Sequence, residues 1–155
     1  GVTTRAQLVQ VLYHLAGDPD MTGVTTPFTD LTSDWYQAAV AWAYKTGVVD
    51  GTSPTTFSPS RPVTREQAAV LLMRYAARLP GFAGSDAPAD LSAFADGGSV
   101  SGWARAGMAD AVALGLFGGT QDTGGRVWLR PGESATRAEI AAVLARFGRN
   151  VAHLL

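Results

Sequence analysis

Three stretches of the chain carry apolar residues at the spacing of an α-helix, and each follows a Thr-Arg pair. After Thr64 and Arg65, for example, apolar side chains recur at positions 68, 71, 72 and 75, which places them on one helix face. The pattern predicts three amphipathic helices, whose first residues are preceded by Thr4, Thr64 and Thr136.

The residues around each Thr support these helix starts. Gln7, Gln67 and Glu139 stand three residues after the respective Thr, which is the spacing of a capping box. In that motif the hydroxyl accepts a bond from a first-turn amide, and the Gln or Glu side chain accepts one from the Thr amide. We therefore expect the three helices to begin at equivalent positions.

Two longer segments of the chain resemble each other in order and spacing. Each has a Phe-x-Asp start, a Trp before an Ala-rich helical segment, a Gly turn and a Pro-containing extended segment ahead of the Thr-Arg pair. The paired positions are Phe28 and Phe94, Asp30 and Asp96, Trp35 and Trp103, Gly51 and Gly119, and Phe57 and Leu129. Such self-similarity indicates a repeat architecture.

The repeats divide the sequence as follows. Residues 1–17 form the second half of a first repeat, and residues 28–80 and 92–150 form two whole repeats. A Gly/Ala/Pro-rich linker at 81–91 joins them, and 151–155 is a tail; together we expect one domain. The last repeat carries a Gly-rich insertion before Leu129, which we expect to border a groove beside Arg137.

The repeated Arg is unusual for its position. A cation in the first turn of a helix is disfavoured by about 0.3–1 kcal/mol. One interpretation is an anion site, because helix-start amides and a guanidinium both suit a carboxylate or phosphate. The other is an internal ion pair, for example between Arg65 and Asp30 or Glu66. The residues alone leave both open.

Composition narrows the function classes. The formal net charge of −1 argues against a nucleic-acid or anionic-membrane surface, and the absence of Cys excludes disulfides and thiolate metal sites. His14 and His153 lack a second His at metal spacing, and no nucleophile or phosphate-loop motif is present. We expect no enzyme activity, no cofactor and no metal site. No apolar run reaches the length of a membrane span.

The ordered motifs Phe-x-Asp, Trp, Ala-rich helix, Gly turn, Phe-x-Pro and Thr-Arg resemble the S-layer homology (SLH) repeat. The resemblance covers almost the whole chain. It implies a mostly helical fold with a pseudo-threefold arrangement around a central three-helix bundle. It also implies a non-catalytic module that anchors a larger exported protein to a bacterial cell surface, through an acidic and often pyruvylated secondary cell wall polysaccharide.

The resemblance further implies a set of ligand-binding residues. Carried over by motif, it assigns acid recognition to the repeated Arg residues, helix-start geometry to the Thr residues, groove walls to Trp and Asp, and close backbone approach to Gly. The residues are Arg5, Arg65, Arg137, Thr4, Thr64, Thr136, Trp35, Trp103, Asp30, Asp96, Gly51 and Gly119.

Alternatives accompany these assignments. Trp35 and Trp103 could equally pack in the core, and Asp30 and Asp96 could cap the turn before the following helix. The front half of the first repeat does not precede Thr4. An alternative function is therefore a helical protein-interaction module that forms homo-oligomers through the incomplete first repeat.

Overall fold

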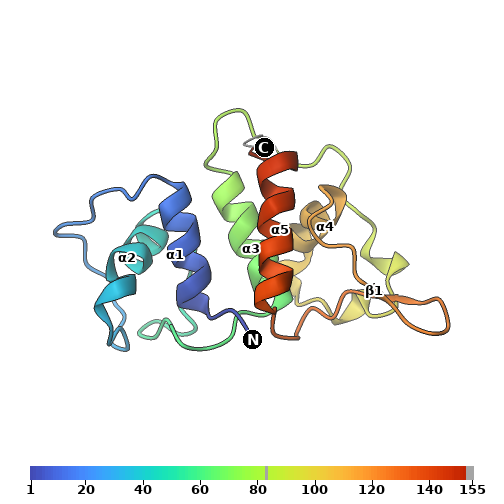
Figure 1. The fold of residues 1–155 in the computed structure, drawn as a ribbon, viewed down its shortest axis with the longest axis horizontal. Helices are drawn as coiled ribbons and strands as arrows, with labels where there is room; N and C mark the ends of the chain where they lie inside the picture. Colours follow the sequence, from blue (N-terminus) through green and yellow to red (C-terminus); the bar gives the residue numbers. More distant parts are fainter. Residues whose placement is uncertain (83, 153–155) are drawn as a thin grey trace. The chain divides into compact units, whose positions relative to one another are not determined.

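The structure, a computed structural model, describes residues 1–82 and 84–152. This part of the chain is mostly helical (Figure 1), which confirms the predicted fold class. The α-helices are α1 (Arg5–Leu15), α2 (Gln37–Lys45), α3 (Arg65–Ala76), α4 (Arg105–Ala113) and α5 (Arg137–Asn150). The 3₁₀ turns are η1 (Asp34–Tyr36), η2 (Leu91–Ala93), η3 (Gly97–Ser99) and η4 (Gly102–Ala104). A hairpin pairs β1 (Thr120–Gln121) with β2 (Val127–Trp128).

The three predicted helix starts are confirmed. Thr4, Thr64 and Thr136 are the N-cap residues of α1, α3 and α5, and each Thr side chain accepts a bond from the amide three residues later. The box is complete at Thr4 and Thr64. At Thr136 only this first bond is made, and the Glu139 carboxylate instead pairs with Arg65. The ion pair with Arg65 thus replaces the second hydrogen bond of the capping box.

The predicted helix over 35–46 begins with a tighter turn. The 3₁₀ turn η1 precedes α2, and the Tyr36 hydroxyl accepts hydrogen bonds from the amides of Thr32 and Ser33 at 2.9 and 3.2 Å. In the later repeat η4 precedes α4 in the same way. The 3₁₀ entry therefore belongs to both repeats, which the periodicity of the apolar residues did not indicate.

The chain divides into two compact units. The N-terminal unit comprises Val2–Val63, and the C-terminal unit comprises Thr64–Leu155 together with Gly1. The division falls inside the sequence repeat 28–80. In the N-terminal unit α1 packs against α2, and in the C-terminal unit α3 packs against α4. The capped helix of one repeat thus buries its apolar face against the first helix of the next repeat.

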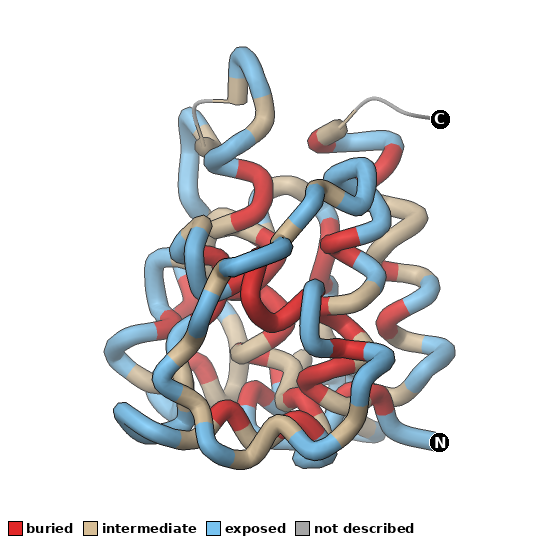
Figure 2. The backbone as a smooth tube through the Cα atoms, turned by 90° about the vertical axis from the view of Figure 1, so that its left-hand side faces the viewer, coloured by how far each residue is buried: buried red, intermediate tan, exposed pale blue. Residues whose placement is uncertain are grey.

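Buried apolar side chains in each unit come from its helices and from the segments that connect them. Figure 2 marks the buried residues in red along the backbone. Fully buried side chains of the N-terminal unit include Leu8, Leu12, Val40, Val48 and Phe57. Those of the C-terminal unit include Leu72, Met108, Leu116, Leu129 and Phe147. Gly107 brings α4 close to α3, because a Cβ there would lie 3.4 Å from the Val70 Cα.

The insertion in the last repeat forms the β1–β2 hairpin. Val127 in β2 accepts a bond from the Ala95 amide at 2.8 Å, which ties the hairpin to the start of its repeat. Leu129, directly after β2, accepts a bond from Arg65. The hairpin therefore adjoins Arg65. These contacts do not place it beside Arg137, where we expected it. Of the tail, Val151 is buried, while His153, Leu154 and Leu155 lie outside the described residues.

Candidate ligand-binding site

Arg5 is enclosed by its own unit. The side chain is only 5% exposed; its Nε donates to the Phe57 carbonyl at 2.9 Å and its Nη2 to the Asp50 carbonyl at 3.2 Å. The guanidinium carbon lies 4.9 Å from the centre of the Phe57 ring. Burial lowers the pKa of Arg5, nearby Arg61 lowers it further, and Asp30 opposes the shift. This guanidinium holds the 50–57 segment against α1.

Arg65 repeats this arrangement in the C-terminal unit with one difference. Its Nε donates to the Leu129 carbonyl at 2.8 Å, and its guanidinium carbon lies 5.4 Å from the centre of the Phe117 ring. A second nitrogen pairs with the Glu139 carboxylate, and the Arg65 side chain is 11% exposed. The expected internal pair therefore exists, but its partner is Glu139 and neither Asp30 nor Glu66.

Asp30 and Asp96 hold equivalent turns far along the chain. The two Asp30 carboxylate oxygens accept bonds from the amides of Phe57 and Ser58 at 2.9 and 2.8 Å. Asp96 accepts in the same way from Leu129 and Arg130, both at 2.8 Å. Ser58 and Arg130 have φ values of 59° and 54°, a left-handed conformation that costs a non-glycine residue about 1–2 kcal/mol. The carboxylates offset that cost.

These contacts also perturb the Asp30 titration. Partial desolvation raises the pKa of Asp30, but the hydrogen bonds from the Phe57 and Ser58 amides outweigh it. The pKa consequently lies below the ordinary aspartate value, with Arg5 contributing in the same direction. The prediction that Asp30 and Asp96 cap the turn before the following helix is therefore wrong in its location, because both carboxylates instead cap turns that come after the first helix of the repeat.

The repeated glycines are required by the protein's own backbone. A Cβ on Gly51 would lie 2.4 Å from the Ser53 carbonyl oxygen and 2.6 Å from the Phe28 ring. Gly119 has a φ of 73°, and a Cβ there would lie 2.8 Å from the Trp128 carbonyl oxygen. Both positions exclude a side chain without any ligand present. Close approach to a sugar at these glycines stays a prediction.

The repeated tryptophans lie at the surface. Trp35 is 53% exposed and Trp103 is 60% exposed, so the interpretation that they pack in the core is wrong. The Trp35 ring has an edge contact with Tyr36 at a centroid distance of 5.0 Å. Trp42, which has no counterpart in the later repeat, is buried and packs near Tyr13 at 6.0 Å. Both repeated indoles are accessible to a sugar face.

The helix starts of α1 and α3 do not offer free first-turn amides. Arg5 and Ala6 donate their amides to the carbonyls of Arg61 and Pro59. Arg65 and Glu66 donate theirs in the same way to Glu133 and Pro131. These bonds contradict the prediction that the first-turn amides of α1 and α3 are available to an anion. The amides already donate to carbonyl groups of other chain segments, and the apolar pattern did not indicate that those segments lie beside the helix starts.

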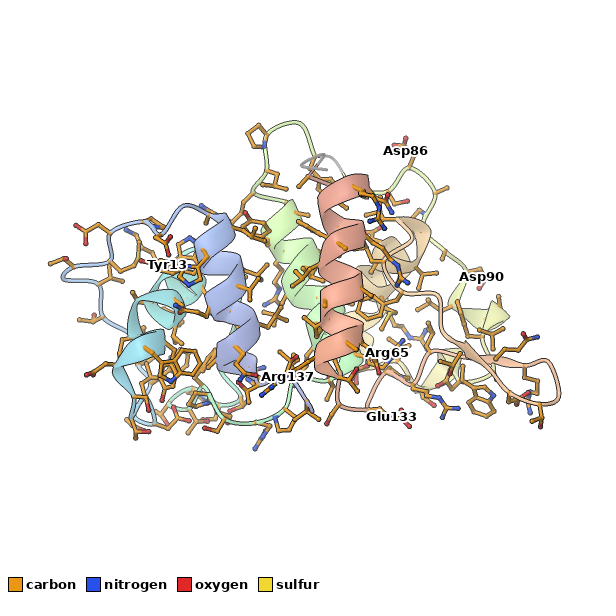
Figure 3. All side chains as sticks on the ribbon, in the orientation of Figure 1. Tyr13, Arg65, Asp86, Asp90, Glu133 and Arg137 are labelled. Carbon is orange, nitrogen blue, oxygen red and sulfur yellow. The ribbon has the colours of Figure 1, made fainter. Side chains whose placement is uncertain are left out.

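Arg137 differs from its two counterparts. Its amide donates to the Gly1 carbonyl at 2.8 Å, so Gly1 holds the place that Arg61 and Glu133 hold before the other helices. The Arg137 side chain is exposed, and within residues 1–82 and 84–152 it makes no hydrogen bond or ion pair. Figure 3 shows Arg137, Arg65 and Glu133 at the end of the C-terminal unit where α3 and α5 begin.

Glu66 is a structural contact that sequence reasoning missed. It is buried, and its carboxylate accepts from the Ser101 amide at 3.0 Å and the Ser101 hydroxyl at 2.6 Å. It thereby fixes the entry to η4 against α3. Alanine occupies the same position in the other two Thr-Arg motifs, so the repeat pattern gave no signal for this role.

A hollow of about 790 Å³ lies in the N-terminal unit between the α1–α2 connection and α2. Its lining includes Tyr13, Asp18, Asp20 and Gln37 and contains no basic side chain. Two carboxylates and no cation disfavour an acidic ligand there. The repeated Arg positions therefore remain the better candidates for acid recognition.

Two searches of the described residues bear on other functions. No group of three or more His, Cys, Asp or Glu side chains in that part of the chain could hold a metal ion. Of the helices described there, none is long and apolar enough to cross a membrane.

Comparisons with a family model and with known proteins identify the same family. A family model described as "S-layer homology domain" matches residues 27–69 and 93–141, which is more than half of the chain. The Surface-layer 125 kDa protein of Lysinibacillus sphaericus is 36% identical over 80% of this chain. The Amylopullulanase of Thermoanaerobacterium thermosulfurigenes is 32% identical over 91%, and the Exoglucanase XynX of Acetivibrio thermocellus is 32% identical over 76%.

The matched region is a small part of each relative. It spans 10% of the surface-layer protein, 7% of the amylopullulanase and 10% of the exoglucanase. Proteins whose names denote different activities thus share this module. Its recurrence supports a non-catalytic role that is common to them all.

Proposed function

The chain belongs to the S-layer homology domain family, and from this premise we propose that it anchors a larger protein to the bacterial cell wall. The ligand is an acidic secondary cell wall polysaccharide, with a pyruvyl ketal as the proposed acidic group. The module carries out no catalysis, and its place is outside the cell. Cell-wall anchoring is the role that membership of this family supports.

One observation supports the site most strongly, namely that the chain builds the same Arg-centred cluster twice. We name the Arg5 cluster (Arg5, Asp30, Gly51, Phe57 and Ser58) and the Arg65 cluster (Arg65, Asp96, Gly119, Leu129 and Arg130). In each, Nε of the Arg donates to the carbonyl of the residue that the Asp also holds. A guanidinium has five N–H groups, so each Arg retains donors beyond these bonds, and those of Arg65 face a pair that a ligand carboxylate could replace.

The three Arg residues have graded roles in this proposal. Arg137 makes the first contact with the acidic group, because its guanidinium is exposed and unpaired among the described residues. Arg65 contributes its remaining donors once the ligand displaces Glu139, whereas Arg5, which is only 5% exposed, holds its own cluster in shape. Exposed Trp35 and Trp103 pack against sugar faces. Thr4, Thr64 and Thr136 fix the helix starts, and several weak contacts along one polymer give avidity.

The test measures retention on wall sacculi of Lysinibacillus sphaericus, with and without their secondary polymer. We compare the unmodified protein with Arg137→Ala, Arg65→Ala and the control Arg149→Ala, whose side chain is exposed near the other end of α5. Loss of one bidentate contact between a guanidinium and a ligand carboxylate should lower the affinity about tenfold. We expect this loss most clearly for Arg137→Ala. Arg65→Ala is compared at equal folded fraction, because it also removes an internal contact.

Three outcomes separate the hypotheses. Polymer-dependent retention that Arg137→Ala weakens and Arg149→Ala does not supports the proposal. Equal retention of all variants returns the repeated Arg residues to a purely structural role. No retention of the unmodified protein, combined with a concentration-dependent dimer in sedimentation, favours the alternative of a helical protein-interaction module that forms homo-oligomers.

A further inference from the structure

The β1–β2 hairpin carries a basic and aromatic surface that the repeat motifs do not include. We name it the hairpin face and define it as Arg126, Trp128 and Arg130. The guanidinium carbons of Arg126 and Arg130 lie 5.3 and 5.9 Å from the centre of the Trp128 ring. Two cations and one indole are therefore grouped within a few residues of chain, directly beside Leu129 of the Arg65 cluster.

The hairpin holds this group in a defined geometry. Asp122 accepts bonds from the amides of Gly124 and Arg126 and from the Trp128 indole nitrogen, each at 2.9 Å. These bonds, that of the indole first, hold the pKa of Asp122 below its ordinary value. The carboxylate is thus committed to shaping the hairpin tip and to orienting the Trp128 ring.

Nearby carboxylates compensate the two cations only in part, and the charge of Arg126 helps to lower the pKa of Asp122. Arg126 is exposed, and its side chain makes no hydrogen bond or ion pair within the part of the chain that the structure describes. Arg130 is 42% exposed; its Nε donates to the Thr120 hydroxyl at 3.0 Å, and its Nη1 lies 3.6 Å from a Glu133 carboxylate oxygen. An exposed pair at that distance contributes little. Both guanidinium groups can therefore still bind a carboxylate.

The N-terminal unit has no such surface at the equivalent turn. There, hydroxyl groups of Thr52, Ser53, Thr56 and Ser58 bond one another at 2.6 to 3.0 Å. Ser58 and Arg130 share the left-handed conformation and the Asp cap, so the same backbone presents a short neutral side chain in one unit and a long cation in the other. The residue type at this position therefore changes the surface charge while the turn conformation and the Asp cap stay the same.

We infer that the hairpin face is a second polysaccharide-binding surface, which contacts a carboxylate-bearing sugar beside the Arg65 cluster. This inference rests on the proposed function and extends it from Arg130 of the Arg65 cluster to Arg126 and Trp128, which lie in the insertion outside the repeated motif. Guanidinium groups suit the sugar acid, and the indole suits its apolar face. A nucleic acid is the weaker match, because binding it depends on many phosphate contacts and the chain has a formal net charge of −1.

The experiment uses the full chain and the same sacculi of Lysinibacillus sphaericus, with and without the secondary polymer. Arg126→Gln/Arg130→Gln is compared with Arg105→Gln/Arg149→Gln, which removes equal charge from exposed positions in α4 and α5. We expect the hairpin variant to bind at least about tenfold more weakly than this control. Trp128→Phe, which keeps a ring but loses the indole donor, should give a smaller loss.

Each result decides the matter. If the unmodified protein binds and the two double variants are equally retained, the hairpin inference is wrong while the proposed function stands. If the unmodified protein is not retained on polymer-bearing sacculi, the proposed function fails and this inference fails with it. Duplex DNA that displaces the protein as well as soluble polymer does at equal charge concentration would show unselective polyanion binding and would also overturn it.

Discussion

Arg5 in the N-terminal unit and Arg65 in the C-terminal unit occupy the same backbone frame but neutralise their charge differently. Arg5 donates to two main-chain carbonyls and is almost fully buried. Arg65 donates to one carbonyl and pairs with the Glu139 carboxylate, which is 38% exposed. The first centre is closed by the backbone, whereas the second is closed by a side chain that water or a ligand can replace.

The turns beside Arg5 and Arg65 also differ in how many groups they leave available to a ligand. The N-terminal unit closes its turn with mutually bonded hydroxyl groups, and the C-terminal unit closes it with a hairpin that carries Trp128 and two Arg residues. The comparison suggests that one copy of the repeated cluster is specialised for stability. The other copy combines the same frame with groups that are available for binding.

The largest expected effect comes from removing the two internal guanidinium groups. Arg5→Ala leaves the buried Phe57 carbonyl without its charged donor, and we expect a loss of about 3 kcal/mol of unfolding free energy. Arg65→Ala should lower the free energy of unfolding by a smaller amount, about 2 kcal/mol, because the unpaired Glu139 carboxylate is 38% exposed and stays solvated. Urea unfolding measures both, with Arg149→Ala as control. Equal losses would show that the two centres are energetically alike.

The next effect concerns the Asp caps. Asp30→Ala unpairs the amides of Phe57 and Ser58, and we expect a loss of about 2 kcal/mol. Asp96→Ala should cost about 1 kcal/mol, since the Arg130 amide is exposed and water can satisfy it. Thermal and urea unfolding provide the comparison. A larger loss for Asp96→Ala would reverse the assignment of the more rigid turn.

The smallest effect is the pH dependence of stability. The folded pKa of Asp30 lies below its unfolded value of about 3.9, so its contribution is present above that pH and is lost as the pH falls through the folded pKa. Unfolding free energies between about pH 5 and about pH 3 should therefore decline less steeply for Asp30→Asn than for the unmodified protein. The exposed Asp86→Asn serves as control, and an unchanged slope would contradict the prediction.

The local sequence pattern was sufficient to predict where the three capped helices begin, but not which distant residues their side chains contact. The capping motifs at Thr4, Thr64 and Thr136 involve residues three apart, so the helix starts could be read directly. The bonds between Asp30 and Ser58, or between Arg65 and Glu139, join residues separated by 28 and 74 positions. Such contacts depend on how helices pack, and neither spacing nor composition specifies them.

The repeat, the three capped helices and the family could all be predicted from the sequence, because those features depend on short-range periodicity and ordered motifs. The tertiary structure decided that α1 packs with α2 and α3 with α4, across the repeat boundaries. It also decided which guanidinium is buried, since burial depends on the segment that packs over each Arg. Arg5 and Arg137 each follow a Thr at equivalent positions of the same motif, yet the first is enclosed by carbonyls and the second is open to solvent.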